Sequence, residues 1–362
     1  MDLAKSAVDV ISTAFEHTMQ QLTQPFRWGQ WVRLAVLALA TGELSSGGGC
    51  SNGWSRLGGL SKVPNSSQNF MDPADILRGI DPALIATMIL VALIGGLVLM
   101  LVWVYVSSIS RFILFESVLR KHCDSLSAGW QRWQGPGLSY FWWQLALSFV
   151  GLGVAAVLFI PLLLPVLATL KNHQQPGPGL ILAFLPMVVV FGIFGLIMLL
   201  IAVLAKDFVV PLMAVDRVGV IEGWRRLLEM IKGEKGSYAG YLGMKIVLSI
   251  GASVLFGILS GIAAMLVFLP FGIAGAVLVI IGHSAGLTWN AFTITAAMVA
   301  GTIALVVLLF AVALVCVPVA VFFPSYAMYF LAERFPALHA RLYPPPHPPE
   351  LSPIAPAVEP TG

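Results

Sequence analysis

The chain has 362 residues, of which 58% are hydrophobic and only 10% charged, and its mean hydropathy is +0.91. An ordinary soluble domain has about 25% charged residues, so this composition excludes a soluble globular protein and indicates a membrane protein. The formal net charge of +3 is too small to indicate a nucleic-acid-binding surface, and no nucleic-acid partner is expected.

The first 25 residues predict an amphipathic helix that lies in the membrane interface. Apolar residues recur at spacings of three and four, whereas Lys5, Asp9 and Glu16 lie off that stripe. Pro25 ends the pattern because proline cannot continue a helix. The apolar stripe consists of Val8, Ile11, Phe15, Met19 and Leu22.

Five apolar stretches are each long enough to cross a bilayer, which takes roughly 20 residues. A sixth, near residues 26–42, is shorter and contains Arg33, so it is either a short first span or a re-entrant or interfacial segment. Together these stretches predict an all-α, polytopic integral membrane protein with about six transmembrane helices in a membrane domain at 26–342. The five plain stretches lie near residues 84–106, 140–164, 179–205, 241–269 and 291–321.

Two segments outside the spans have the composition of loops. Residues 43–81 are rich in Gly, Ser and Asn, and we expect them to form an outer loop. Residues 343–362 contain eight prolines, a composition that predicts a disordered tail.

The basic residues predict the orientation of the spans. With six spans, both termini lie on one side of the membrane. Assigning that side to the cytoplasm places 16 of the 20 Lys and Arg residues there, as the positive-inside rule requires. We therefore expect a protein of the cell (inner) membrane with both termini in the cytoplasm.

Two parts of the chain resemble each other and indicate an internal repeat. Residues 128–133 match 222–227 around a shared Gly-Trp pair, and in the spans that follow Tyr140 matches Tyr241. Each unit reads as an inward-going span, a basic amphipathic helix and an outward-going span. Such repeats occur in transporters, and duplication also serves plain scaffolds.

The two basic helices carry the candidate binding residues. Trp side chains favour the membrane interface, and neighbouring Arg side chains are suited to anionic lipid headgroups. Positive-inside bias alone also places basic residues there, and it is the favoured explanation. The candidate lipid-headgroup contacts are Trp130, Arg132, Trp224, Arg225, Arg226 and Lys232.

Ionisable residues are almost absent from the centres of the five plain spans. Gln144 and Lys245 occupy matching repeat positions about one turn inside the membrane, where the lysine side chain is expected to extend to the headgroups. Pro270 is expected to end the fifth span. No catalytic, nucleotide-binding or metal-ligand motif occurs, so we expect no enzymatic activity, no cofactor and no metal.

Two stretches carry a resemblance to a known group of proteins: Phe208–Met213, which leads through Val220–Trp224 to a basic helix, and Gln24–Trp31. The chain resembles uncharacterised prokaryotic multi-pass membrane proteins related to the membrane domain that accompanies glycerophosphoryl diester phosphodiesterases. The resemblance covers roughly residues 4–340 and implies a six-span helical fold in a bacterial or archaeal cell membrane. It carries no catalytic residues across, because the soluble phosphodiesterase domain has no counterpart in this chain.

Two functional hypotheses follow. The first is a non-enzymatic membrane protein that acts through contacts with lipids, anionic ones among them, or with a membrane-protein partner, as a scaffold or in envelope maintenance. The alternative is a transporter or permease subunit for a solute or lipid. A polar cavity between the repeats would favour transport, whereas a densely packed bundle would favour the scaffold.

Overall fold

The structure is a computed structural model that describes residues 7–43, 82–123, 125–171, 178–284 and 291–343. Within these ranges the regular structure is helical and contains no strand, in agreement with the predicted all-α class. The predicted outer loop at 43–81 and the predicted tail at 343–362 fall, apart from Glu43 and Tyr343, outside the described residues.

Five helices are long and apolar enough to cross a membrane. They contain the five plain stretches, so the prediction of several apolar helices of spanning length is confirmed for these five. Their bounds are α6 (Pro82–Leu119), α7 (Leu126–Lys171), α8 (Pro178–Leu204), α11 (Lys235–Ser284) and α12 (Ala291–Ala332).

The prediction that Pro270 ends the fifth span is wrong, because α11 continues through Pro270 to Ser284. A proline removes one helical hydrogen bond and strains the preceding turn. A full break at this depth would leave several backbone groups without partners in lipid, which costs more than one missing bond. The helix therefore continues as long as the sequence stays apolar.

The segment near residues 26–42 forms α2 (Trp28–Thr41), a helix of only 14 residues. At a rise of 1.5 Å per residue it is about 21 Å long, which is shorter than a hydrocarbon core of about 30 Å. It follows α1 (Asp9–Thr23), and both helices pack against α12. A sixth span is therefore not found among the described residues.

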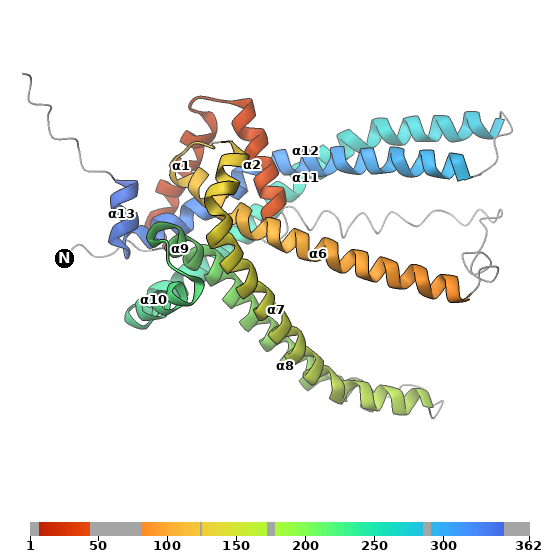
Figure 1. The fold of residues 1–362 in the computed structure, drawn as a ribbon, viewed down its shortest axis with the longest axis horizontal. Helices are drawn as coiled ribbons and strands as arrows, with labels where there is room; N and C mark the ends of the chain where they lie inside the picture. The colour runs from red at the N-terminus through yellow and green to blue at the C-terminus, as the bar shows by residue number, and fades with distance from the viewer. Residues whose placement is uncertain (1–6, 44–81, 124, 172–177, 285–290, 344–362) are drawn as a thin grey trace, which may run out of the picture.

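The buried residues gather at one end of the molecule, which we call the head bundle. It consists of α1, α2, the π-helical turn η2 (Ala205–Val209), α9 (Val210–Asp216), α10 (Val220–Gly233), α13 (Pro336–Leu342) and the adjoining ends of α6, α7, α11 and α12. Figure 1 shows these short helices clustered at one end, with the long helices extending away from them. The head bundle therefore contains the larger of two hydrophobic cores in the described residues, and a smaller one lies between α11 and α12 around Leu308, Val312 and Cys316.

Aromatic rings fill the centre of the head bundle. The rings of Tyr241 and Phe330 lie with their centroids 4.7 Å apart, and Phe208 lies 4.9 Å from Tyr241. Tyr326 stacks on the other side of Tyr241 at 5.0 Å. These contacts join η2, α11 and α12, because each helix contributes at least one buried ring.

Beyond the head bundle the long helices separate into three arms. One arm is α6 alone, the second is α7 with α8, and the third is α11 with α12 (Figure 1). In the most apolar window of four of the five spans almost no residue is buried. Long, uncovered apolar helices of this kind are stable only where lipid or another apolar surface covers them.

The described basic residues gather in the head bundle, with Lys171 at the far end of α7 as the exception. The described ends of the chain lie there too, since α1 begins and α13 ends in the head bundle (Figure 1). The basic residues that the sequence assigned to one side of the membrane therefore lie at one end of the folded molecule.

Two glycines of α7 test how tightly α6 and α7 pack. A Cβ atom at Gly137 would lie 2.6 Å from Ile109 Cγ1 and 3.1 Å from the Ile109 Cα, whereas a Cβ at Gly135 would meet nothing within 4 Å. Gly137→Ala should therefore lower the free energy of unfolding by about 1–3 kcal/mol, as overpacking does. Unfolding by sodium dodecyl sulfate in mixed micelles measures the difference.

The matched control is Gly135→Ala, which should leave stability unchanged or raise it by up to about 1 kcal/mol, because alanine favours helix over glycine. Equal effects of the two substitutions would contradict the close approach of α6 and α7.

Candidate functional site

Of the predicted headgroup residues, those from the first basic helix lie at the start of α7. The ring of Trp130 packs edge-on against Tyr105, with centroids 5.8 Å apart. Arg132 forms an ion pair with Glu116, which also accepts a hydrogen bond from the Trp133 indole. Trp130 and Arg132 therefore have partners within the chain.

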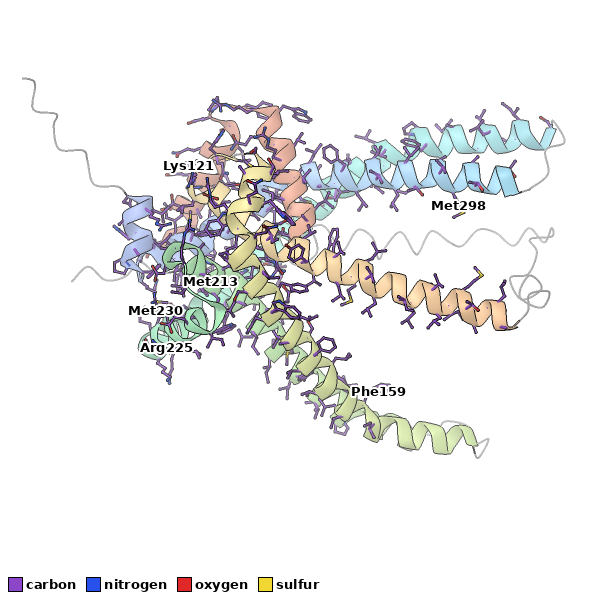
Figure 2. The ribbon with its side chains drawn as sticks, viewed as in Figure 1. Lys121, Phe159, Met213, Arg225, Met230 and Met298 are labelled. Atoms are coloured by element: carbon purple, nitrogen blue, oxygen red, sulfur yellow. The ribbon has the colours of Figure 1, made fainter. Side chains whose placement is uncertain are left out.

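The residues from the second basic helix lie on α10 and divide between two roles. Arg226 forms ion pairs with Asp216 and Glu222, which fix the corner between α9 and α10. The side chain of Arg225 is 70% exposed, with one contact to Glu222 at 3.1 Å, and Lys232 is exposed. Figure 2 shows Arg225 on the outer side of α10.

The remaining candidate, Trp224, lies between the two basic helices. Its ring packs against Trp143 of α7, with centroids 5.7 Å apart, and its indole nitrogen is buried without a hydrogen-bond partner among the described residues. The structure thus brings α10 against α7 at Trp143, further along α7 than the basic segment at its start. Arg132, at the start of α7, is held by its own local ion pair.

α10 also has an apolar edge that faces away from the core. Val220 and Leu227 are buried, whereas Ile221 is 84% exposed and Leu228 is 49% exposed. Ile221 and Leu228 are seven residues apart and so lie on the same side of the helix, next to Arg225. α10 therefore presents one face to the core and, on the opposite side, an exposed stripe along which Ile221 and Leu228 alternate with Arg225 and Lys232.

The centre of the head bundle contains a cluster of ionisable side chains that sequence analysis did not bring together. We call Glu43, Arg111, Lys206, Asp207 and Lys245 the buried charge cluster. Asp207 pairs with Lys245 and accepts a hydrogen bond from the Tyr241 hydroxyl at 3.0 Å, and Lys206 pairs with Glu43. These pairs join helices that are far apart in the sequence.

The local geometry of Lys206 and Asp207 has a cause in the sequence. Pro211 lacks the N–H that would bond to the carbonyl of Asp207, and its ring crowds that carbonyl. The chain accommodates this in η2, where the Val210 N–H bonds to the carbonyl of Ala205, five residues back. Both charged side chains come from this one π-helical turn, a feature that often occurs at functional sites.

A small cavity of about 30 Å³ lies beside the cluster. Arg111, Glu43, Lys206 and Asp207 supply its polar walls. The remaining lining is apolar and comes from α6, α9 and α12: Leu114, Phe115, Val210, Pro211, Pro324 and Ala327. This volume accommodates two or three water-sized atoms at roughly 10–15 Å³ each, so the cavity is too small for a sugar or an amino acid.

Several residues occupy equivalent positions in the two units that resemble each other in sequence. The guanidinium of Arg111 donates to the Tyr140 hydroxyl at 2.9 Å, as the Tyr241 hydroxyl donates to Asp207. In each unit a non-glycine residue with a φ of 54° follows the end of the helix before the loop, Lys121 after α6 and Arg217 after α9.

The glycines before the two tryptophans also match. A Cβ at Gly129 would lie 3.1 Å from Ile113, and one at Gly223 would lie 3.0 Å from Val209. In both units glycine therefore permits a close approach to the preceding helix.

Lys245 does not extend to the headgroups as predicted, because its side chain is 11% exposed and pairs with Asp207. The reason is that Asp207 lies on a neighbouring helix within reach, and a buried ammonium next to a carboxylate is more stable than an unpaired one. Its counterpart Gln144 lies 3.5 Å from the Ser108 hydroxyl. The sequence offered one sign that Lys245 has a partner inside the protein: it lies four residues after Tyr241 and so on the same face of α11, and both side chains contact Asp207.

No group of three or more His, Cys, Asp or Glu side chains in the described part of the chain is placed to hold a metal ion. The charged groups of the cavity are paired or hydrogen-bonded within the head bundle.

A second polar contact fixes α1 to the spans. The Nε2 of the buried His17 lies 2.9 Å from the carbonyl of Val118, and its Nδ1 lies 2.9 Å from the Tyr329 hydroxyl. Because a carbonyl only accepts, Nε2 carries the proton and the tyrosine hydroxyl donates to Nδ1. Burial lowers the pKa of His17 from 6.5 to about 4, with the carbonyl of Val118 opposing the shift and Lys121 adding to it.

A family model described as "Family of unknown function (DUF7544)" matches residues 5–341. No curated protein and no solved structure matches the chain.

The Asp207–Lys245 pair gives a prediction about stability. Asp207→Asn leaves Lys245 buried without a counter-charge and should lower the free energy of unfolding by about 3–5 kcal/mol. The double variant Asp207→Asn with Lys245→Met removes both charges and should recover most of that loss. Unfolding in mixed micelles measures both free energies. Equal losses of stability in the single and double variants would show that the unpaired charge of Lys245 is not the cause of the loss.

His17 gives a prediction about pH. The unfolded chain takes up a proton near pH 6.5, whereas the folded protein resists it until about pH 4, so stability is complete above pH 6.5 and falls as the pH drops through this window. The loss should be about 2 kcal/mol by pH 4, after allowance for partial solvation. His17→Gln cannot titrate, so its difference from wild type should shrink as the pH falls. An unfolding series from pH 7.5 to 4 in both proteins measures this, and parallel curves would contradict it.

Proposed function

The chain belongs to DUF7544, a family of unknown function, and from that premise we propose that it is a non-enzymatic multi-pass membrane protein whose head bundle binds anionic lipid headgroups. The lipid contact is made by α10, with α1 as a second interfacial element. Scaffolding of a membrane-protein partner is compatible with this role, since the head bundle is a rigid platform carried on separate spans.

The observation that carries the proposal is the composite surface of α10. Ile221 and Leu228 are exposed on one edge, and Arg225 and Lys232 are exposed beside them. A helix with an apolar edge and adjacent basic residues binds a membrane surface through burial of the apolar side chains and attraction to anionic headgroups. Arg132 and Arg226 instead stabilise the fold through their own ion pairs.

α1 supports the same interpretation. The predicted apolar stripe divides in the structure: Leu22 is buried, whereas Val8, Phe15 and Met19 are exposed. Phe26 is exposed in the turn that leads to α2. An apolar edge of this kind is stable at the level of the acyl chains and headgroups, and unfavourable in water.

We place the head bundle, and with it both described ends of the chain, on the cytoplasmic side of a prokaryotic cell membrane. The support is the basic charge gathered there, because Lys and Arg resist translocation. The inner leaflet is also where anionic lipids give a negative surface potential, which suits a basic lipid-binding surface.

Internal duplication is part of the proposal. The matching tyrosines, glycines and left-handed residues of the two units favour a duplicated unit of span, corner and span. Duplication would also suit a transporter, which is the alternative. The small cavity and the uncovered, largely apolar faces of the arms, which carry no charged side chain in their most apolar stretches, favour the lipid-binding role, because a solute path needs polar groups along the spans.

The proposal predicts that charge on α10 sets lipid retention. Arg225→Gln with Lys232→Gln should reduce co-purified phosphatidylglycerol roughly thirtyfold relative to wild type, at about 1 kcal/mol for each of the two basic residues near an anionic surface. Phosphatidylcholine retention should not change. Native mass spectrometry of the protein released from micelles with each lipid measures the difference.

The matched control is Arg120→Gln, an exposed arginine at the head-bundle end of α6. It removes one charge without touching α10 and should leave lipid retention within about twofold. A second variant, Ile221→Ser with Leu228→Ser, should weaken retention of both lipids while unfolding stays unchanged, because both side chains are exposed. Wild-type retention in both α10 variants would overturn the proposal.

A further inference from the structure

We propose that the cavity beside Arg111 is a binding site for one phosphate group, carried either by a lipid headgroup or by free inorganic phosphate. The site is separate from the exposed surface of α10 and is indicated by a charge imbalance in the buried charge cluster.

The cluster contains three cations and two carboxylates. Glu43 pairs with Lys206, and Asp207 pairs with Lys245, so each carboxylate is already matched by a lysine. Arg111 is the cation left over. Within the described residues its hydrogen-bond partner is the neutral Tyr140 hydroxyl, and no carboxylate lies in ion-pair distance of its guanidinium.

One nitrogen of the Arg111 guanidinium is also without a partner. Its Nε is fully buried and has no hydrogen-bond acceptor among the described residues. A buried N–H without an acceptor costs about 1–3 kcal/mol, and more when the group is charged. An acceptor in the adjoining cavity would remove that cost.

The comparison of the two units explains why the imbalance exists. In the second unit, the side chain one turn after Tyr241 is Lys245, which supplies the counter-charge of Asp207. In the first unit the corresponding side chain, one turn after Tyr140, is Gln144, which has no charge. Arg111 therefore occupies the position that Asp207 has in the second unit. Asp207 has an ionic partner, whereas Arg111 has none within the described residues.

The cavity is open on one side and accommodates two or three oxygen-sized atoms, so it can take two or three oxygens of a phosphate group while the rest of the group extends through the opening. Arg111 and Lys206 both line it, and its remaining walls are largely apolar. A guanidinium binds oxyanions through parallel N–H groups, and low-dielectric walls strengthen that attraction. Glu43 and Asp207 also line the cavity, and each is neutralised by its lysine, so the net charge facing an occupant is positive.

The test is the thermal stability of the whole protein in micelles with added inorganic phosphate, or with dihexanoyl phosphatidic acid below its micellar concentration, against sodium chloride at equal ionic strength. Wild type should show a saturable rise in Tm of about 3 °C with one of the phosphate compounds and none with chloride. A rise with the free ion identifies a soluble phosphate as the occupant, and a rise with the short-chain lipid alone identifies a headgroup. No rise with either compound overturns the proposal.

Two substitutions locate the effect. Arg111→Gln removes the cation and should abolish the rise, and because this variant could also fail to fold, Gln144→Glu provides the independent test. The new carboxylate supplies the missing counter-charge, so Gln144→Glu should raise Tm without ligand and lose the response to phosphate. A full phosphate response in Gln144→Glu overturns the proposal. The Arg225→Gln, Lys232→Gln variant should keep the response, which separates this site from lipid binding by α10.

Discussion

The pairing of Asp207 with Lys245 is the constraint on which the rest of the structure depends. A carboxylate and an ammonium with so little access to water are stable only when each faces the other, so η2 and α11 cannot move apart without exposing both charges. Tyr241 donates a hydrogen bond to the same carboxylate, and the aromatic rings of α12 pack against the ring of Tyr241. The Glu43–Lys206 pair then fixes the end of α2 to the neighbouring position of the same π turn.

This constraint explains why the core lies at one end of the molecule. The spans are held together where polar and aromatic side chains meet, and beyond that point the surfaces that face one another are largely apolar. In lipid such surface gains little from helix–helix contact, because acyl chains are equally apolar. The arms therefore separate, and the head bundle is the part that can present a defined surface to headgroups or to a partner.

Much of the fold could be predicted from the sequence, because long apolar runs and charge asymmetry are local signals. The hydropathy of α6, α7, α8, α11 and α12 identified all five spanning helices. The site was harder, because Asp207 and Lys245 are 38 positions apart and neither residue carries a sign of the other. Arg225 and Arg226 were both predicted as headgroup contacts, yet Arg226 pairs with Asp216, which precedes α10, whereas the side chain of Arg225 stays 70% exposed.

The separation of the arms is tested most directly by spin labels placed at Ile94 on α6, Phe159 on α7 and Met298 on α12, in protein reconstituted into bilayers. The collision rate of each label with oxygen, which concentrates in lipid, is compared with that of a water-soluble nickel chelate. Exposure of all three side chains predicts high oxygen and low nickel accessibility at every position. Low accessibility to both reagents at these positions would show that the spans pack into one closed bundle, and would contradict the account of a head bundle carried on separate, lipid-covered arms.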